Sequence, residues 1–279
     1  MDGWRFTGDP DAFDAAAGAL LRADPARNTT HLTILDTLRH TGPHAYGTAD
    51  PVFGWFGGAE PVAAFLCTPT FPILLTAAPD DAARALAETL TFDPSGVNAE
   101  PSAAAAFAAA WERRTGAVPW TLMQQRLYRL ETLVPPRPTP PGAAGTARAA
   151  DAPLVLGWLD EFTAEAGGAA PVAVMEERLR TGCVVLWEVD GEPVAMAGRT
   201  PALDGMSRVA PVYTRPAHRR RGYGAAVTAA VTRSALDAGV RHIVLFTDLS
   251  NPTSNGIYRA VGYRPVTDRL LLGFGEGNG

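Results

Sequence analysis

The residues best suited to chemistry form a short run of arginines and glycines between a predicted strand and a predicted helix. The run Arg219-Arg220-Arg221-Gly222-Tyr223-Gly224-Ala225 follows the β-branched, apolar segment 208–214 and precedes apolar residues at helical spacing up to Gly239. The first amides of a helix have no partner inside it, and the helix dipole adds positive character there. Glycines allow close backbone approach, and arginines attract anions. The run therefore predicts a site for a diphosphate group.

Three other interpretations of this run compete with a diphosphate site. A dinucleotide-binding loop would need a third glycine where Val227 stands, and an acidic residue about twenty positions further on that is not well placed here. A P-loop needs Gly-Lys-Ser/Thr, and the sequence contains no lysine. A nucleic-acid contact is disfavoured by the net charge of −5 and by the lack of a second basic cluster. The diphosphate site remains the favoured interpretation.

A second segment downstream has the pattern of a short, capped helix. It follows a predicted strand at 241–247. Asn251 before Pro252 is typical of an N-cap followed by proline at the first helical position, and Gly262 is typical of a C-terminal cap. Tyr258 lies on one side of this helix with Ile257. Such a tyrosine is either an ordinary half-buried aromatic or, beside a reacting group, a proton donor.

The two segments together resemble the acetyl-CoA signature of the GNAT acyltransferase superfamily. The family's R/Q-x-x-G-x-G/A loop matches residues 219–225, and its later asparagine, tyrosine and Gly-aromatic element matches Asn251, Tyr258 and Gly262-Tyr263. The resemblance covers residues 150–272. It implies an α/β fold with a central, mostly antiparallel mixed sheet flanked by helices, and acetyl-CoA as co-substrate.

The resemblance also implies roles for individual residues. The strand ending at 212–214 would pair its free backbone groups with the pantetheine arm, and the arginine-glycine loop would surround the pyrophosphate. Tyr258 matches the family's general acid, and Asn251 would be both an N-cap and a contact near the pantetheine. The cofactor-binding residues expected on this basis are Val212, Tyr213, Thr214, Arg219, Arg220, Arg221, Gly222, Tyr223, Gly224, Ala225, Asn251 and Tyr258.

The general base is not specified by the resemblance. Many family members carry a glutamate five positions before the Asn251 position, and this chain has Phe246 there. Asp248 and Glu165, the latter on a predicted helix at 154–166, are the catalytic candidates beside Tyr258. An aspartate just before a helix often forms local turn hydrogen bonds instead. Glu188 and a chain of water molecules are further alternatives.

A proline- and glycine-rich stretch at 135–147 divides the sequence into two halves. Its proline density is typical of a linker and excludes a helix or a central strand. We therefore expect one domain at 1–134 and a catalytic GNAT domain at 148–279.

The two halves share an internal repeat. Residues 55–63 and 187–195 both begin with Trp and end with Glu-Pro-Val-Ala, and each predicts a hairpin with a tight turn. At the place of the arginine-glycine run the first half has Asp80 and Asp81, which would repel a diphosphate. The first half is therefore expected to be a degenerate GNAT-like domain. Its predicted helices are 10–24, 27–41, 80–91 and 102–115, and its predicted strands are 51–57, 60–68, 71–77, 96–100 and 122–133.

Composition limits the class of protein. The 279 residues are 47% hydrophobic and 19% charged, as in folded globular proteins. No apolar run is long enough to cross a bilayer, and the start of the sequence has no secretory signal pattern. Cys67 and Cys183 have no metal-binding spacing, so we expect no metal. We expect a cytoplasmic protein, and arginine in place of lysine suggests a GC-rich bacterial genome.

The expected function is acetyl-CoA-dependent transfer of an acetyl group to the amine of a small molecule. One alternative is a non-catalytic CoA-binding regulatory or scaffold protein, which Phe246 favours and Tyr258 disfavours. Aminoacyl transfer from tRNA is a third interpretation, disfavoured by the acidic net charge. No nucleic-acid or membrane partner is expected, and a homodimer is left open.

Overall fold

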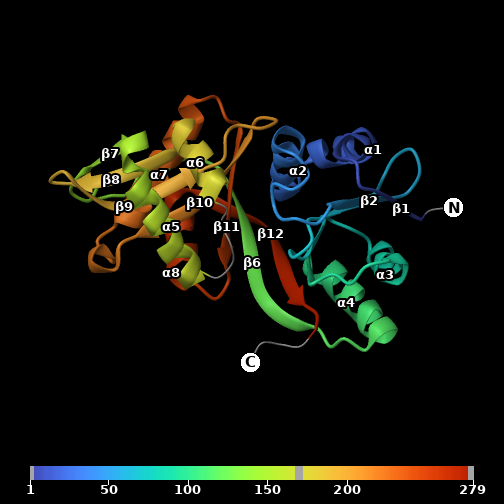
Figure 1. Cartoon of the computed structure of the whole chain (residues 1–279). Coiled ribbons are helices and arrows are strands. Elements are labelled where there is room, and N and C mark those ends of the chain that lie inside the picture. Colours follow the sequence, from blue (N-terminus) through green and yellow to red (C-terminus); the bar gives the residue numbers. More distant parts are fainter. Residues whose placement is uncertain (1–2, 167–171, 276–279) are drawn as a thin grey trace. The chain divides into compact units, whose positions relative to one another are not determined.

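The elements of the first half of the sequence alternate between short strands and helices. The computed structural model describes residues 3–166 and 172–275 (Figure 1). The elements in order are β1 (Trp4–Thr7), α1 (Pro10–Ala23), α2 (Thr29–Thr41), β2 (Val52–Phe56), β3 (Ala63–Cys67), β4 (Ile73–Leu75), α3 (Asp80–Thr89), β5 (Gly96–Ala99), α4 (Pro101–Thr115) and β6 (Trp120–Leu130). Each predicted helix and strand of this half is present, and β1 is an addition that the sequence did not indicate.

The second half repeats this order of elements. They are β7 (Ala143–Thr146), α5 (Ala152–Ala166), α6 (Val172–Arg180), β8 (Val184–Val189), β9 (Glu192–Arg199), β10 (Met206–Thr214), α7 (Tyr223–Asp237), β11 (His242–Asp248), α8 (Pro252–Val261) and β12 (Tyr263–Gly273). Short 3₁₀ turns at Ala149–Asp151 and Pro216–His218 complete it. The strand and helix on either side of the arginine-glycine run are therefore β10 and α7, as predicted.

The chain folds into two compact units whose limits differ from the predicted domains. The first unit comprises Met1–Leu127, Asp248–Ser250 and Thr267–Gly279, and the second comprises Tyr128–Thr247 and Asn251–Val266. The stretch predicted as a linker belongs to the second unit, because Trp187 Nε1 donates a hydrogen bond to the carbonyl oxygen of Pro141 at 2.9 Å. Residues Ala143–Thr146 then form β7, which pairs antiparallel with β8.

The last strand of each half of the sequence is exchanged, because β12 lies beside β5 and β6 lies beside β11. Both strands are divided between the units: Trp120–Leu127 of β6 and Thr267–Gly273 of β12 belong to the first unit, and Tyr128–Leu130 of β6 and Tyr263–Val266 of β12 belong to the second. β12 pairs antiparallel with β5, from Leu270 opposite Ala99 to Gly273 opposite Gly96. Pairs β4/β5 and β10/β11 are parallel, whereas the other neighbours with a defined register are antiparallel. The exchange explains why a boundary drawn between the halves does not match the folded units.

The two repeated hairpins have different turns. In β8/β9 the residues Asp190 and Gly191 alone connect Val189 and Glu192, with φ of 51° and 81°. This is the positive-φ turn that matches strand twist. In β2/β3 the connection is longer, from 57 to 62, and only Gly57 has a positive φ. The prediction of a tight turn is thus correct for the second hairpin and wrong for the first, which lacks the Asp-Gly pair.

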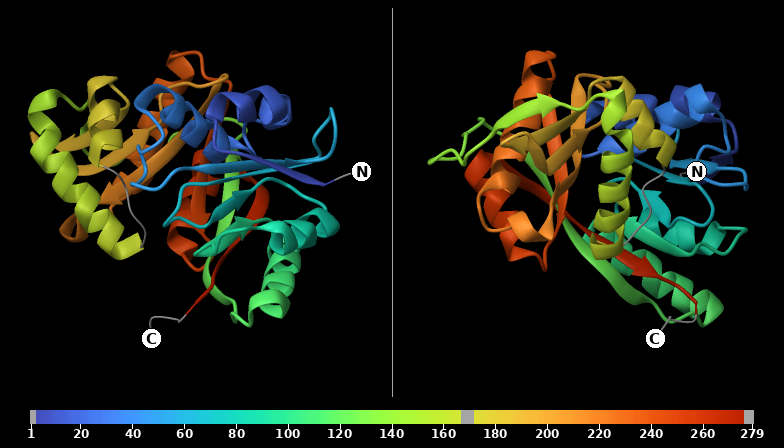
Figure 2. Two further views of the ribbon diagram at one scale, coloured as in Figure 1. Left: turned by 45° about the vertical axis from the view of Figure 1, so that its right-hand side comes forward. Right: turned by 60° about the vertical axis from the view of Figure 1, so that its left-hand side comes forward.

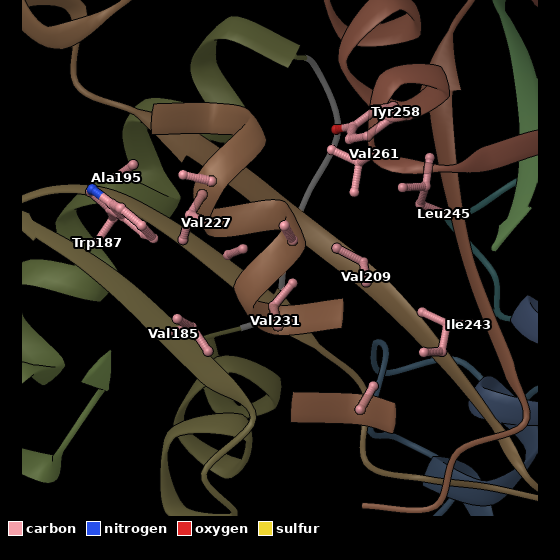
Figure 3. Close-up of a cluster of buried hydrophobic side chains, with 14 of the residues drawn as sticks. Val185, Trp187, Ala195, Val209, Val227, Val231, Ile243, Leu245, Tyr258 and Val261 are labelled. Atoms are coloured by element: carbon pink, nitrogen blue, oxygen red, sulfur yellow. The ribbon is translucent and has the colours of Figure 1, made fainter. Parts of the chain in front are cut away.

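Each sheet is covered on both faces. In the second unit, alternate residues of β8 separate the two faces: Val185 and Trp187 pack with α7, and Val184 and Leu186 pack with α5 and α6. Figure 3 shows the first of these clusters, and both views of Figure 2 show α5 and α6 on the face opposite α7. In the first unit α3 and α4 pack on one face of the sheet. Phe13 of α1 stacks on Phe53 of β2, with ring centroids 5.0 Å apart.

Candidate active site

The candidate site of the second unit begins where the pairing of β10 and β11 ends. Their parallel pairing ends at Arg208 opposite Val244, although both strands continue for several residues. β10 also has a register shift between Val209 and Val212 in its pairing with β9. A bulge of this kind bends its strand and ends the regular ladder. The C-terminal part of β10 therefore has an edge that β11 does not cover.

The backbone of β10 presents polar groups along this edge. Arg215 N–H donates to the carbonyl oxygen of Val194 in β9 at 3.1 Å. Backbone groups alternate in direction along a strand, so those of Tyr213 also face β9 and those of Val212 and Thr214 face the open edge. Unpaired strand edges bind extended chains by main-chain hydrogen bonds. This edge can pair with an arm that carries amide groups, as the resemblance implied for 212–214.

The loop between β10 and α7 turns several amides toward one place. Arg220 and Gly222 both have a left-handed backbone, with φ of 61° and 85°. Gly222 is the N-cap of α7, no side chain caps the helix, and the first internal bond runs from Ala226 N–H to the Gly222 carbonyl at 3.0 Å. In the described part of the chain, the amides of residues 223–225 have no backbone or side-chain acceptor. They are therefore available to an anion.

Gly224 marks where three elements of the site meet. A Cβ added at Gly224 would lie 3.5 Å from Oγ1 of Thr214 in β10 and 3.6 Å from Cδ1 of Ile257 in α8. These are ordinary van der Waals distances. The start of α7, the end of β10 and the helix that carries Tyr258 thus converge on one side of the loop.

The three arginines of the run have different surroundings. Arg220 and Arg221 are exposed, and neither has an ion pair or hydrogen bond to another residue within 3–166 and 172–275. Arg219 instead donates from Nε to the carbonyl oxygen of Thr214 at 3.0 Å, and its Nη2 contacts both carboxylate oxygens of Glu165 at 2.7 and 2.8 Å. Arg220 and Arg221 therefore have guanidinium groups ready for phosphate, whereas Arg219 fastens the loop to β10 and α5.

Glu161, one turn before Glu165 on α5, is a site residue that the sequence analysis did not identify. It accepts a hydrogen bond from the Tyr213 hydroxyl. Burial, and then this bond, raise the pKa of Tyr213 to about 12. The Arg219 guanidinium carbon lies 5.8 Å from the Tyr213 ring centroid. The spacing of four residues between two glutamates on one predicted helix was the available signal, because such residues share a face.

The predicted general acid lies in the buried core of the second unit. Tyr258 is 9% exposed, and its ring contacts Tyr263 edge-on at 6.3 Å between centroids. Figure 3 shows the ring beside Val261, with the hydroxyl oxygen at the edge of the cluster. Burial raises the pKa of Tyr258 to about 12, so the phenol stays protonated at neutral pH. Its hydroxyl makes no hydrogen bond to another described residue, and it can therefore donate to a ligand.

Asn251 is the N-cap that the sequence predicts. Its side-chain oxygen accepts from Ser254 N–H at 3.0 Å, and Pro252 follows it at the start of α8. Gly262 ends the helix with φ of 106°. The predicted limits of this helix are therefore correct at both ends.

The two candidate bases have other partners. Glu165 binds Arg219 with both oxygens, as described above. Asp248 ends β11 and belongs to the first unit, where its Oδ1 accepts from Ser250 N–H at 2.7 Å. It also lines a cavity of about 460 Å³ in that unit, together with Thr121, Leu122, Met123, Gln124, Leu249 and Ser250. The local turn bond considered for Asp248 is therefore present.

The corresponding place in the first unit is built differently. The start of α3 carries Asp80 and Asp81, which accept from Ser102 Oγ and from the Ala82 amide, each at 2.8 Å. Beyond the parallel pairing of β4 and β5, the buried Arg269 of β12 bridges the two strands. Its Nη2 donates to the carbonyl oxygens of Leu75 at 2.9 Å and Asn98 at 2.6 Å. A side chain thus occupies the backbone acceptors that lie between these strands.

The described residues contain neither a group of metal ligands nor a membrane-spanning helix. Among residues 3–166 and 172–275, no three His, Cys, Asp or Glu side chains are grouped so that they could hold a metal ion. No helix in the part of the chain that the structure describes has both the length and the apolar character needed to cross a membrane.

Comparison with known proteins agrees with this geometry. The model of the acetyltransferase (GNAT) family matches residues 153–263. No curated protein sequence matches the chain significantly. Among solved structures, a GCN5-related N-acetyltransferase from Sphaerobacter thermophilus is 16% identical and has a TM-score of 0.62, covering 96% of this chain and 94% of its own. A Drosophila protein is 15% identical, with a TM-score of 0.68 and 99% of each chain covered.

A third structure is more similar in sequence over a shorter length. A GCN5-related N-acetyltransferase from Kribbella flavida is 23% identical, with a TM-score of 0.55, covering 77% of this chain and 87% of its own. At these identities the structures establish the fold, which extends over both halves of the chain. Residues 153–263 are therefore an acyltransferase domain of the GNAT family, and the first half of the chain shares the family's fold.

Proposed function

We propose that the protein is an acetyl-CoA-dependent N-acetyltransferase that transfers the acetyl group directly to the amine of a small molecule. The observation that carries the proposal combines two features: α7 starts at Gly222 without a side-chain cap, and the edge of β10 at Val212 and the Thr214 amide is not paired with β11. The first suits a diphosphate and the second suits a chain with amide groups. A coenzyme A thioester contains both.

The residues present fit such a co-substrate. The free amides of 223–225 and the side chains of Arg220 and Arg221 would hold the pyrophosphate, because both are positive and unpaired within the described residues. The β10 edge would hold the pantetheine arm. When bound, acetyl-CoA supplies an activated acyl group as a thioester.

The chain's own contribution is to place an acceptor and to move protons. The acceptor's amine nitrogen forms a bond to the thioester carbonyl carbon, and the carbon–sulfur bond breaks. The departing sulfur takes one proton, and the nitrogen loses one. Tyr258 is proposed to donate the first proton from its phenol oxygen, because burial keeps this group protonated and its hydroxyl has no partner among the described residues.

Two carboxylates, Asp248 and Glu165, are the candidates for removing the amine proton. Asp248 is proposed as the base because it is the carboxylate that ends β11, next to the helix that carries Tyr258 in the sequence. Glu165 is proposed to hold Arg219 rather than to accept a proton, because Nη2 of Arg219 contacts both of its carboxylate oxygens. The net charge of −5 favours a cationic amine as acceptor.

A non-catalytic CoA-binding protein is the second candidate, and Phe246 favours it, because a glutamate is common at that position in the family. A thiol-release assay with acetyl-CoA and a panel of amines separates the two candidates. A protein that only binds acetyl-CoA has affinity for it but releases no free CoA thiol.

In an active protein, Tyr258→Phe should lower kcat by about 10²-fold or more and leave the Kd of acetyl-CoA unchanged in titration calorimetry. An equal loss of turnover and affinity would show that the phenol is structural.

A further inference from the structure

A tyrosine from the first half of the sequence is buried against the helix that carries Tyr258. Tyr128, near the end of β6, is fully buried. Its hydroxyl donates to Oδ1 of Asn255 at 2.9 Å and accepts from Nε of Arg259 at 3.2 Å. Both partners belong to α8. Asn255 precedes Tyr258 by one turn, and Arg259 follows it directly, so a single hydroxyl contacts α8 on both sides of the proposed acid.

The same contact extends to the start of α8. Asn255 is buried, and its Nδ2 donates to the carbonyl oxygen of Asn251 at 2.8 Å. Asn251 in turn caps the helix through Ser254. The Tyr128 hydroxyl is therefore joined through one side chain to the N-cap residue. A buried amide that lost its partner would be left unsatisfied, which favours this arrangement over alternatives.

The residues after Tyr128 contact the other end of α8. Glu131 N–H donates to the carbonyl oxygen of Gly262 at 3.1 Å, and Val134 N–H donates to that of Val261 at 2.9 Å. A Cβ at Gly262 would lie 1.8 Å from the carbonyl oxygen of Thr132. Such a distance is impossible without movement of the backbone. Glycine at 262 is thus required by the close approach of residues 128–134 as well as by its own φ of 106°.

We infer that residues 128–134, here called the clasp, hold α8 in the orientation that the reaction needs, and that Tyr128 is a positioning residue for Tyr258. The inference rests on the proposed function of Tyr258. The clasp contacts the first turn, the middle and the C-terminal cap of α8, and it comes from the half of the sequence that lacks the arginine-glycine loop. A small misplacement of a catalytic group can cost a large factor in rate.

The test compares Tyr128→Phe with Ser207→Ala. Ser207 of β10 is also fully buried, but its hydroxyl donates to the carbonyl oxygen of Thr200 at 2.6 Å. Each variant loses one buried hydroxyl, so both should lose similar thermal stability. We expect kcat of Tyr128→Phe to fall about tenfold with the Kd of acetyl-CoA changed less than threefold, and kcat of Ser207→Ala to change less than threefold. Equal kcat losses in the two variants would overturn the inference.

Hydrogen exchange gives a readout that does not depend on turnover. Amides of α8 should exchange about tenfold faster in Tyr128→Phe than in the wild type, and at the wild-type rate in Ser207→Ala. Wild-type exchange of α8 in Tyr128→Phe would refute the clasp. If the wild type acetylates no amine, the proposed function fails while the exchange result still decides the inference. Should Tyr128→Phe not fold, Arg259→Met removes the exposed partner of the same hydroxyl and should change α8 exchange and kcat in the same direction.

Discussion

Arg220 offers a test in which stability and binding should move in opposite directions. Its backbone has φ of 61°, a conformation that only glycine, asparagine and aspartate adopt at low cost, and its side chain has no partner in the described residues. Arg220→Asn keeps this backbone accessible and removes the charge. The variant should therefore be at least as stable as the wild type and should bind acetyl-CoA less tightly.

The expected changes in Tm and in Kd follow from the backbone and the charge of Arg220. Relief of left-handed strain at one residue amounts to about 1 kcal/mol, which for a protein of this size corresponds to a rise in Tm of about 2–4 °C. Loss of one charge-assisted contact to a phosphate costs about 1.5 kcal/mol, or roughly tenfold in Kd. The difference in Kd should shrink as salt rises from 0.05 to about 0.5 M, because an exposed pair is screened.

Titration calorimetry with acetyl-CoA at several salt concentrations measures the Kd. Thermal denaturation of the same samples measures the Tm. Arg233→Gln is the matched control. It removes the same charge from an exposed position of α7, ten residues and about 15 Å along the helix from the loop, and should leave Kd within twofold. If Arg220→Asn binds acetyl-CoA like the wild type, the loop does not hold the diphosphate. If its Tm falls with its affinity, Arg220 supports the loop instead.

Two further predictions concern the first half of the chain. Burial lowers the pKa of His31 to about 3 from 6.5, so the unfolded chain binds a proton between these values that the folded chain does not. Stability in urea should therefore fall by about 2 kcal/mol between pH 6 and pH 4, and His31→Gln should flatten that slope; an unchanged slope would contradict the assignment. Residues 1–134 and 135–279 expressed separately should not unfold cooperatively, because β6 and β12 are exchanged, whereas co-expression should give a folded pair. A cooperative transition in either half alone would contradict this.

The local elements could be predicted from the sequence because their signals are local. Asn251, Pro252 and Gly262 are within one helix of each other, and they determine where α8 begins and ends. The positive-φ loop was indicated by Gly222 in the same way. The role of Arg219 could not be predicted, since its partner Glu165 is 54 residues away and nothing in the spacing joins them. The same holds for Glu161 and Tyr213.

The sequence could not predict which strands pair with each other, for a related reason. A strand at 122–133 was predicted, but its partner is decided by register and packing and not by its own residues. β6 follows α4 and β12 follows α8, so each strand could have paired with the other strands of its own half. The stretch at 135–147 contains β7, which pairs with β8, and its Pro141 carbonyl oxygen accepts a hydrogen bond from Trp187, a residue that lies 46 positions away.

Strand exchange also gives the first half of the chain a role in the second unit, although the start of α3 lacks the features of a coenzyme site. Carboxylates stand at the start of α3, and Arg269 fills the space between the ends of β4 and β5. Neither change affects β6, which enters the second unit beside β11 and carries Tyr128 to α8. In this arrangement the first half can lack a ligand of its own and still be required for turnover. Substitutions that disturb β6 should therefore impair the reaction through the position of α8.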